Sequence, residues 1–365
     1  MPSTSQSIQC SMSSFWTNDL IDFVPAFLAT GLANPQRLLV ATAAQELRVY
    51  DAAEDGSAVL RAANSTLALK KSPPPGSEGL FACATPDPGF DNTWWTSANG
   101  MTELGTPLIR FTQWRLSEDS WTLSIEDNNY LENGTRIRHE SRTYLMDRAW
   151  DIDFLDSRDA LRLLFSGVFT TEAPPSRSVT AIGVVVIYRH HNPQPHHEVL
   201  HAHVVVEEHS DREAPRLLLS VDRWSNERLI YTANRSTRRV SVHTYSADLM
   251  KFSELRHWSV GARFVEVFDI AARDGVVAIA GMRPDGGTAL ELYDGHGVLQ
   301  ATVPFASDHH FTGVAFANSP AITAQYPRGA WLWRMGRFVH VDARADFEKR
   351  DRFLNRYHLG RWDVE

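Results

Sequence analysis

The sequence has few cysteines and lacks any long apolar run. Only Cys10 and Cys83 occur among 365 residues, so neither a disulfide framework nor a thiolate zinc site is expected, and a reducing compartment is favoured. No stretch approaches the roughly 18 consecutive apolar residues that a membrane-spanning helix needs. Residues 1–14 hold no basic cluster and no apolar segment, which predicts a disordered tail rather than a secretory signal. We therefore expect a cytoplasmic protein without membrane insertion, with the nucleus as the alternative location.

Positive charge is also scarce. The formal net charge is −8, and lysine is confined to four positions, Lys70, Lys71, Lys251 and Lys349. Because nucleic-acid binding depends on clustered basic side chains that displace counterions, direct nucleic-acid binding is not expected.

The sequence does contain a repeated pattern of short strands. Residues 47–51 (LRVYD) and 290–294 (LELYD) are nearly the same five-residue ending, and each follows an apolar run and a turn, at 38–43 and 276–281. With the strand partner that comes after each ending, this order outlines one four-stranded blade of a β-propeller, which must stack against copies of itself. Strands of five to ten residues recur along the chain without a long amphipathic helix among them, so the predicted fold class is all-β.

The length of the chain predicts about seven blades of about 45 residues, with six as the alternative. We expect the propeller to occupy residues 15–345, after the tail at 1–14. In the segment 346–365, apolar residues fall on one helical face and Gly360 stands at the position of a left-handed cap, which predicts a short C-terminal helix. This helix would dock on the ring or, as the alternative, bind a partner.

The blade endings also suggest a family. The chain resembles the WD-repeat propellers, whose blades end in an aromatic residue and Asp, in its two Tyr-Asp pairs at 50–51 and 293–294. The resemblance is at the level of architecture, because the Gly-His pair that opens a blade in that family directly follows the second ending here, at 295–296. The Trp-Asp pair at 150–151 precedes a strand instead of closing one. The resemblance implies a rigid platform for protein assembly.

No local catalytic or cofactor motif is present. The sequence has no Gly-x-Ser-x-Gly elbow, no phosphate-binding Gly-x-x-x-x-Gly-Lys loop and no dinucleotide-binding Gly-x-Gly-x-x-Gly run. No catalytic residue is therefore named, no cofactor or metal is expected, and the interpretation leans against an enzyme. A propeller can still assemble a site from several blades, which no local pattern reveals.

One string matches the zinc-protease pattern, residues 197–201 (HEVLH). In that chemistry two histidines one helical turn apart bind zinc while the glutamate activates a water. The string runs into the β-branched segment 203–206, which predicts a strand. On a strand, residues four apart are separated by about 13 Å, too far to share one zinc ion. The protease and a broader histidine-rich surface metal site are minor alternatives.

Acidic residues near the middle of the chain are the candidates for a site in the central channel. Asp151, Asp153 and Asp156 are suited to supply carboxylates there, whereas the favoured interpretation places them at strand ends and turns, where Asp accepts backbone hydrogen bonds.

Tryptophan supplies the candidates for partner binding. Trp94 and Trp95 lie between turn-forming segments and are the predicted interaction residues if they are exposed, because tryptophan is common among interface anchors. The alternative is that at least one belongs to the core. Trp331 and Trp333 alternate on a predicted strand and are assigned to packing between blades.

These observations predict a non-enzymatic interaction scaffold, or a subunit of a multiprotein assembly, that binds other proteins through the faces of the propeller. The alternative is a propeller hydrolase or lyase acting on a small molecule in the central channel. Convergent carboxylates or histidines with shifted pKa values in the channel would favour the enzyme.

Overall fold

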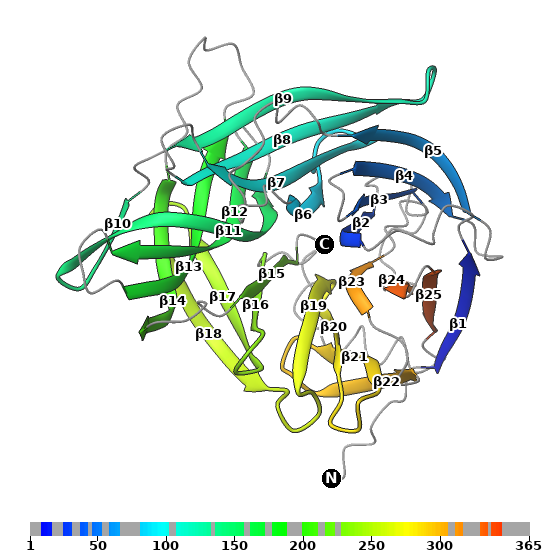
Figure 1. Cartoon of the computed structure of the whole chain (residues 1–365). Coiled ribbons are helices and arrows are strands. Elements are labelled where there is room, and N and C mark those ends of the chain that lie inside the picture. The colour runs from blue at the N-terminus through cyan, green and yellow to red at the C-terminus, as the bar shows by residue number, and fades with distance from the viewer. Residues whose placement is uncertain are drawn as a thin grey trace, which may run out of the picture.

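The chain forms a ring of antiparallel sheets (Figure 1). The computed structural model describes residues 9–16, 25–30, 37–42, 46–52, 58–65, 81–101, 107–132, 136–156, 161–171, 177–187, 199–210, 216–222, 228–305, 311–316, 329–334 and 337–344. Within these segments the regular secondary structure is β-strand. No helix of the described segments has the length and apolar character to cross a membrane.

Four of the sheets consist of four strands that follow one another along the chain. The first two are β2 (Pro25–Thr30), β3 (Arg37–Thr42), β4 (Glu46–Ala52) and β5 (Ala58–Ser65), and β6 (Phe81–Pro86), β7 (Thr93–Met101), β8 (Pro107–Ser117) and β9 (Thr122–Glu132). The other two are β15 (Leu217–Val221), β16 (Ile230–Asn234), β17 (Arg239–Ser246) and β18 (Lys251–Ser259), and β19 (Glu266–Arg273), β20 (Val276–Met282), β21 (Thr288–Asp294) and β22 (Leu299–Phe305).

Two sheets depart from this plan. One has five strands, β10 (Arg136–His139), β11 (Arg142–Asp156), β12 (Leu161–Thr171), β13 (Arg177–Ile187) and β14 (Val199–Ser210). The other joins both ends of the described chain, since it pairs β1 (Gln9–Trp16) with β25 (Arg337–Arg344), next to β24 (Gly329–Arg334) and β23 (Phe311–Phe316).

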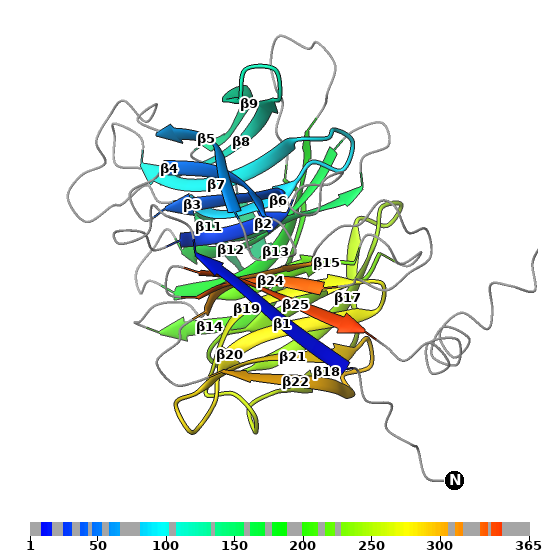
Figure 2. The ribbon, with the colours of Figure 1, turned by 90° about the vertical axis from the view of Figure 1, so that its right-hand side faces the viewer.

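The innermost strand of each sheet touches the innermost strands of its two neighbours, which closes the ring. These strands are β2, β6, β11, β15, β19 and β23, with β23 in contact with β2, and Figure 1 shows them around the centre. On the outside, Gln9 pairs with Arg344 and Trp16 with Arg337. In Figure 2, β1 therefore lies at the edge of the ring nearest the viewer.

The propeller architecture predicted from the repeat is confirmed, but the preferred number of seven blades is not. The described strands form five four-stranded sheets and one five-stranded sheet. The five-stranded sheet extends from Arg136 to Ser210, with strands of up to 15 residues. It therefore uses far more chain than the roughly 45 residues assumed for a blade.

The expected domain boundaries need one correction. Residues 9–14 were assigned to a disordered tail, yet they belong to β1 and pair with β25 along its length. This strand alternates polar Ser11 and Ser13 with Cys10 and Met12, a pattern too weak to identify without its partner strand. The predicted helix in 346–365 lies outside the described residues.

Tight turns set the register of the hairpins. Arg273 pairs with Val276, which leaves only Asp274 and Gly275 in the turn, with φ angles of 48° and 73°. Two left-handed residues form the turn whose twist matches that of the flanking strands, and Asp-Gly is a preferred sequence for it.

The core lies between the sheets, where large side chains of neighbouring blades pack together. Trp95 and Phe111 from the sheet of β6–β9 share a buried cluster with Phe154 and Phe165 from the next sheet. A Cβ atom on Gly183 would lie 2.4 Å from Cζ of Phe165, so this ring occupies the space that a side chain at 183 would need.

Candidate functional site

The predicted interaction residues Trp94 and Trp95 are not on the surface, so that prediction was wrong. Both lie in β7 and are 0% and 1% exposed. Successive residues of a strand point to opposite faces of the sheet, so each indole packs into a different core cluster. The Trp95 Nε1–H also donates to Oδ2 of Asp87 at 2.8 Å. The alternative assignment to the core is the correct one.

The histidine-rich string is only partly described. His197 and Glu198 lie outside the described residues, whereas His201 belongs to strand β14. The described part is thus a strand, as expected. No group of three potential metal ligands occurs in the part of the chain that the structure describes. Trp331 and Trp333 belong to β24, as predicted, where their backbones pair with His340 and Phe338.

All three candidate aspartates lie on the innermost strand β11, and the side chains of Asp151 and Asp153 bind the backbone of the next blade. Asp151 Oδ2 accepts the Leu219 N–H at 2.9 Å, and Asp153 Oδ2 accepts the Val221 N–H at 2.7 Å. Both carboxylates are buried. Asp156 ends β11 and pairs through its backbone with Arg162. The favoured assignment to strand ends and turns therefore needs correction for Asp151 and Asp153, although their predicted bonding to backbone donors is present.

The same kind of bond recurs around the ring. Ser220 Oγ accepts the Ala272 N–H at 2.9 Å, and Asp269 Oδ2 accepts the Val314 N–H at 2.7 Å. On the other side of β11, the Thr85 hydroxyl donates to Oδ1 of Asp153 at 2.8 Å. Polar side chains of the innermost strands thus accept hydrogen bonds from backbone N–H groups of the adjacent blade. Without these acceptors, the N–H groups would be buried and unsatisfied, which would destabilise the fold.

β-Bulges position several residues near the axis of the ring. The strands β2, β6 and β19 each contain one extra residue near their start, directly before Phe27, Cys83 and Asp269. The longer strand β11 has three register shifts, one of them directly before Asp151. A bulge changes the direction in which a side chain points and is frequent next to functional sites. In β11 the extra residue before Asp151 is Trp150. We call Cys83, Trp150, Asp151, Arg216 and Asp269 the axial cluster.

The charges of the axial cluster interact across the axis. Burial and then the charge of Asp151 raise the pKa of Asp269 to about 7, against the hydrogen bonds from the Val314 and Ile270 N–H groups. Burial also raises the pKa of Asp151, while hydrogen bonds and the positive charge of Arg216 act in the opposite direction. Asp269 is half-buried. β15 contacts both β11 and β19, so the charge of Asp151 acts on Asp269 across one blade.

The thiol of Cys83 belongs to this cluster as a neutral group. Burial, followed by the charge and hydrogen bonding of Asp151, raises its pKa well above the ordinary value. A thiol held in this protonated form is a poor nucleophile.

Arg216 and Trp150 form the second part of the axial cluster. The Arg216 guanidinium lies 5.6 Å from the centre of the Trp150 ring, and that of Arg148 lies 5.4 Å from it. Arg148 also pairs with Asp147 at 3.0 Å. The Nε of Arg216 and the Nε1 of Trp150 are buried without a hydrogen-bond acceptor among the described residues.

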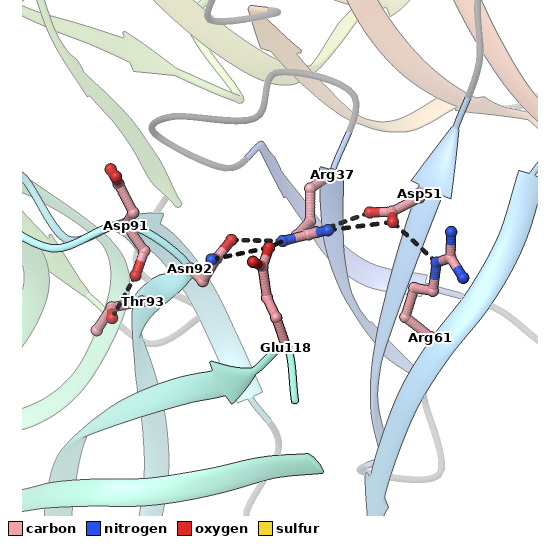
Figure 3. Close-up of polar contacts among 7 residues, drawn as sticks. All are labelled: Arg37, Asp51, Arg61, Asp91, Asn92, Thr93 and Glu118. Carbon is pink, nitrogen blue, oxygen red and sulfur yellow. Dashed lines mark hydrogen bonds and ion pairs between the residues drawn. The ribbon is translucent and has the colours of Figure 1, made fainter. Parts of the chain in front are cut away.

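A separate polar cluster joins the sheet of β2–β5 to the sheet of β6–β9. Arg37 is its centre (Figure 3). The guanidinium donates to Asp51 at 2.7 and 3.1 Å, to Asn92 at 2.6 Å and to Glu118 at 2.6 Å. The Arg37 side chain is 4% exposed. Burial alone would raise the pKa of Asp51, but Arg37 and then Arg61 lower it below its usual range.

Trp121 lies at the surface of this cluster. Its ring stacks with Arg61, whose guanidinium carbon lies 4.6 Å from the ring centre, and Arg37 lies 5.5 Å from it. Trp121 is 37% exposed and has a φ angle of 51°. A bulky residue in left-handed backbone is strained, and such strain is concentrated at functional sites. We call Arg37, Asp51, Arg61, Glu118 and Trp121 the Trp121 junction.

The sequence did not reveal the Trp121 junction, and of the axial cluster it indicated only Asp151. Trp121 lies directly before β9, which begins at Thr122, and no local motif marks it as a surface residue. Arg37 and Glu118 are 81 positions apart, and no local pattern connects them. For the axial cluster, the Trp-Asp pair at 150–151 was the available signal.

The comparisons with known proteins concern the fold. No family model matches the sequence, and no curated protein matches it. A solved structure of a luciferin-regenerating enzyme is similar with a TM-score of 0.51 and 12% identity, over 91% of this chain and 96% of that one. At this identity the similarity establishes the fold alone.

Two further solved structures have lower TM-scores. The C-terminal WD40 domain of Sif2 has a TM-score of 0.45 at 9% identity, over 93% of this chain and 99% of that one. Sqt1 from Chaetomium thermophilum has a TM-score of 0.44 at 11% identity, over 87% of this chain and 83% of that one.

Proposed function

We propose that this chain is a non-enzymatic platform for protein interaction, a subunit of an assembly in the cytoplasm or nucleus, and that a partner binds at the Trp121 junction. The observation that carries the proposal is the exposed Trp121 indole, stacked against Arg61. Tryptophan and arginine are the residue types most enriched among binding hot spots. Trp121 is also held in place by the buried Arg37, so little conformational freedom would be lost on binding.

The surroundings of Trp121 indicate the chemistry of the partner. Phe90 is 50% exposed and adds apolar surface. It lies in the same turn as Asn92, whose side-chain amide donates a hydrogen bond to Glu118. The exposed residues Asp91, Glu118 and Asp119 lie in the same two turns. An aromatic centre with an acidic rim is complementary to a protein segment that carries apolar and basic side chains.

Affinity purification with quantitative mass spectrometry tests the proposal. We expect tagged wild-type protein, purified at low salt, to retain a partner in near-stoichiometric amount. Trp121→Ala should reduce its recovery at least about tenfold, because hot-spot truncations cost about 2 kcal/mol or more. The matched control is Leu249→Ala, an apolar residue that is 75% exposed on the turn between β17 and β18. Equal recovery with both variants, or wild-type protein that purifies alone, would contradict the proposal.

A propeller hydrolase or lyase acting on a small molecule in the channel is the second candidate. One observation favours it: burial and the charge of Asp151 raise the pKa of Asp269 to about 7, which suits a general acid near neutral pH. It is the weaker proposal, because Asp269 and Asp151 each accept backbone N–H groups at both oxygens. Carboxylates engaged in this way hold strands together.

A further inference from the structure

Strand β5 is an edge strand beside the Trp121 junction. It is the last strand in the order β2–β3–β4–β5, where one side pairs with β4, and no described strand pairs with its other side. Figure 1 shows β5 on the outer rim of the ring. The N–H and C=O groups along such an edge are a template for another strand, which is why proteins usually cover their edges or place charges on them.

The end of β5 near Trp121 carries apolar side chains at the surface. Val59 is 48% exposed and Leu60 is 39% exposed, and because successive residues of a strand point to opposite faces, both faces are apolar here. Val59 pairs with Asp51, so it lies on the face that carries this member of the Trp121 junction. The bulge in β5 leaves Arg61 without a cross-strand partner, and Arg61 stacks on Trp121. The edge of β5 and the indole thus belong to one surface.

The turns beside this surface carry an excess of negative charge. The two arginines of the Trp121 junction are bound to its two carboxylates, so these charges balance. Asp91 and Asp119 lie exposed in the two adjoining turns, and neither turn, at 87–92 and 118–121, contains lysine or arginine. A segment that docks here is therefore favoured by basic side chains and disfavoured by acidic ones.

We propose that the partner at the Trp121 junction contributes an extended segment that adds to the edge of β5 as a further strand. This inference rests on the proposed function and specifies the form and chemistry of the partner. Main-chain hydrogen bonds would hold the segment about 4.8 Å from β5, and every second side chain would lie on the face of Val59 and Trp121. On that face we expect an apolar side chain against the indole and a basic one near Asp119.

Selection from displayed random peptides of about 10 residues, the length of a long strand, tests the proposal. Wild-type protein should enrich peptides in which apolar and basic residues recur at every second position. Val59→Lys places a like charge on the edge and should weaken binding of an enriched peptide about tenfold in fluorescence anisotropy. Val298→Lys is the matched control, because that valine is 56% exposed in the turn before β22. It should leave the affinity within about twofold of wild type.

Methylation of single backbone nitrogens in an enriched peptide separates strand addition from docking by side chains alone. In an added strand every second N–H group bonds to β5, so methylation should weaken binding about tenfold at alternate positions and about twofold or less between them. This test uses the wild-type protein and does not depend on the folding of a variant. Equal effects at successive positions, no effect anywhere, or effects every third or fourth position, as on a helix, would overturn the proposal.

Failure of this proposal can be distinguished from failure of the proposed function. If Trp121→Ala abolishes recovery of the cellular partner, but Val59→Lys binds peptides like Val298→Lys and the alternating methylation pattern is absent, strand addition is wrong and the proposed function stands. If the alternating pattern is present but Trp121→Ala changes neither peptide affinity nor partner recovery, the edge binds a strand and the proposed role of Trp121 is wrong. Enrichment of no peptide would count against strand addition alone.

Discussion

Removing the carboxylate of Asp153 should weaken the joints between three successive blades. Its oxygens accept the Thr85 hydroxyl at 2.8 Å from one neighbouring sheet and the Val221 N–H at 2.7 Å from the other. In Asp153→Ala these two donors, and the Phe154 N–H that Oδ1 also accepts at 2.8 Å, lose their acceptor in a buried environment. Each unsatisfied buried donor costs about 1–3 kcal/mol, so the expected loss of unfolding free energy is on the order of 4 kcal/mol.

Thermal unfolding followed by circular dichroism measures this loss. With about 2.1 cal/mol/K of unfolding entropy per residue and 365 residues, a loss of about 4 kcal/mol lowers Tm by about 5 °C. Asp153→Asn, which keeps one acceptor oxygen, should fall between Asp153→Ala and wild type.

Asp285→Ala is the control for a general effect of removing an aspartate. Its side chain is 62% exposed and lies 3.5 Å from Arg283, so the loss should stay below about 1 kcal/mol. The interpretation that carboxylates of the innermost strands stabilise the contacts between blades is refuted if the Tm of Asp153→Ala lies within about 1 °C of that of wild type. It is also refuted if Asp153→Ala and Asp285→Ala lose equal stability.

Three further predictions concern stability. Gly281→Ala should lower the unfolding free energy by about 1–3 kcal/mol in urea titrations, because its Cβ would lie 2.5 Å from the backbone oxygen of Glu266. Burial lowers the pKa of His243 to about 4, so the unfolded chain takes up the proton first as the pH falls. Between pH 7 and pH 5, the unfolding free energy of wild type should fall by about 2 kcal/mol, whereas that of His243→Gln should not show this fall. Equal dependence of the unfolding free energy on pH in the two proteins would contradict this. Arg37→Met should lower the unfolding free energy by about 2 kcal/mol, because Asp51, Asn92 and Glu118 lose the cation that they share. An unchanged Tm in thermal unfolding would contradict this.

The blade pattern could be predicted because it is local. The apolar run at 276–281 and the ending at 290–294 correspond to β20 and β21, and the turn before β20 has the sequence Asp-Gly. Each of these features depends on residues within one hairpin, where alternation and turn chemistry determine the pairing. The sequence therefore predicts the architecture far better than the number of blades.

The sites could not be predicted because they depend on pairing between distant segments. Arg37 meets Glu118 only when two blades pack together, and the charge of Asp151 acts on Asp269 only when the blades are assembled. Trp94 illustrates the opposite error: flanking turn residues suggested exposure, but tertiary packing covers it completely. Strand β1 was missed for the same reason, since its partner is at the other end of the sequence.

Oxidative footprinting of Trp121 tests the central functional claim most directly. Hydroxyl-radical modification would be compared between the isolated protein and the protein in the assembly purified from cells, with Met250, 50% exposed on another blade, as the internal reference. The account predicts that Trp121 is modified several-fold more slowly in the assembly while Met250 is modified at the same rate. Equal modification of Trp121 in both samples would contradict it.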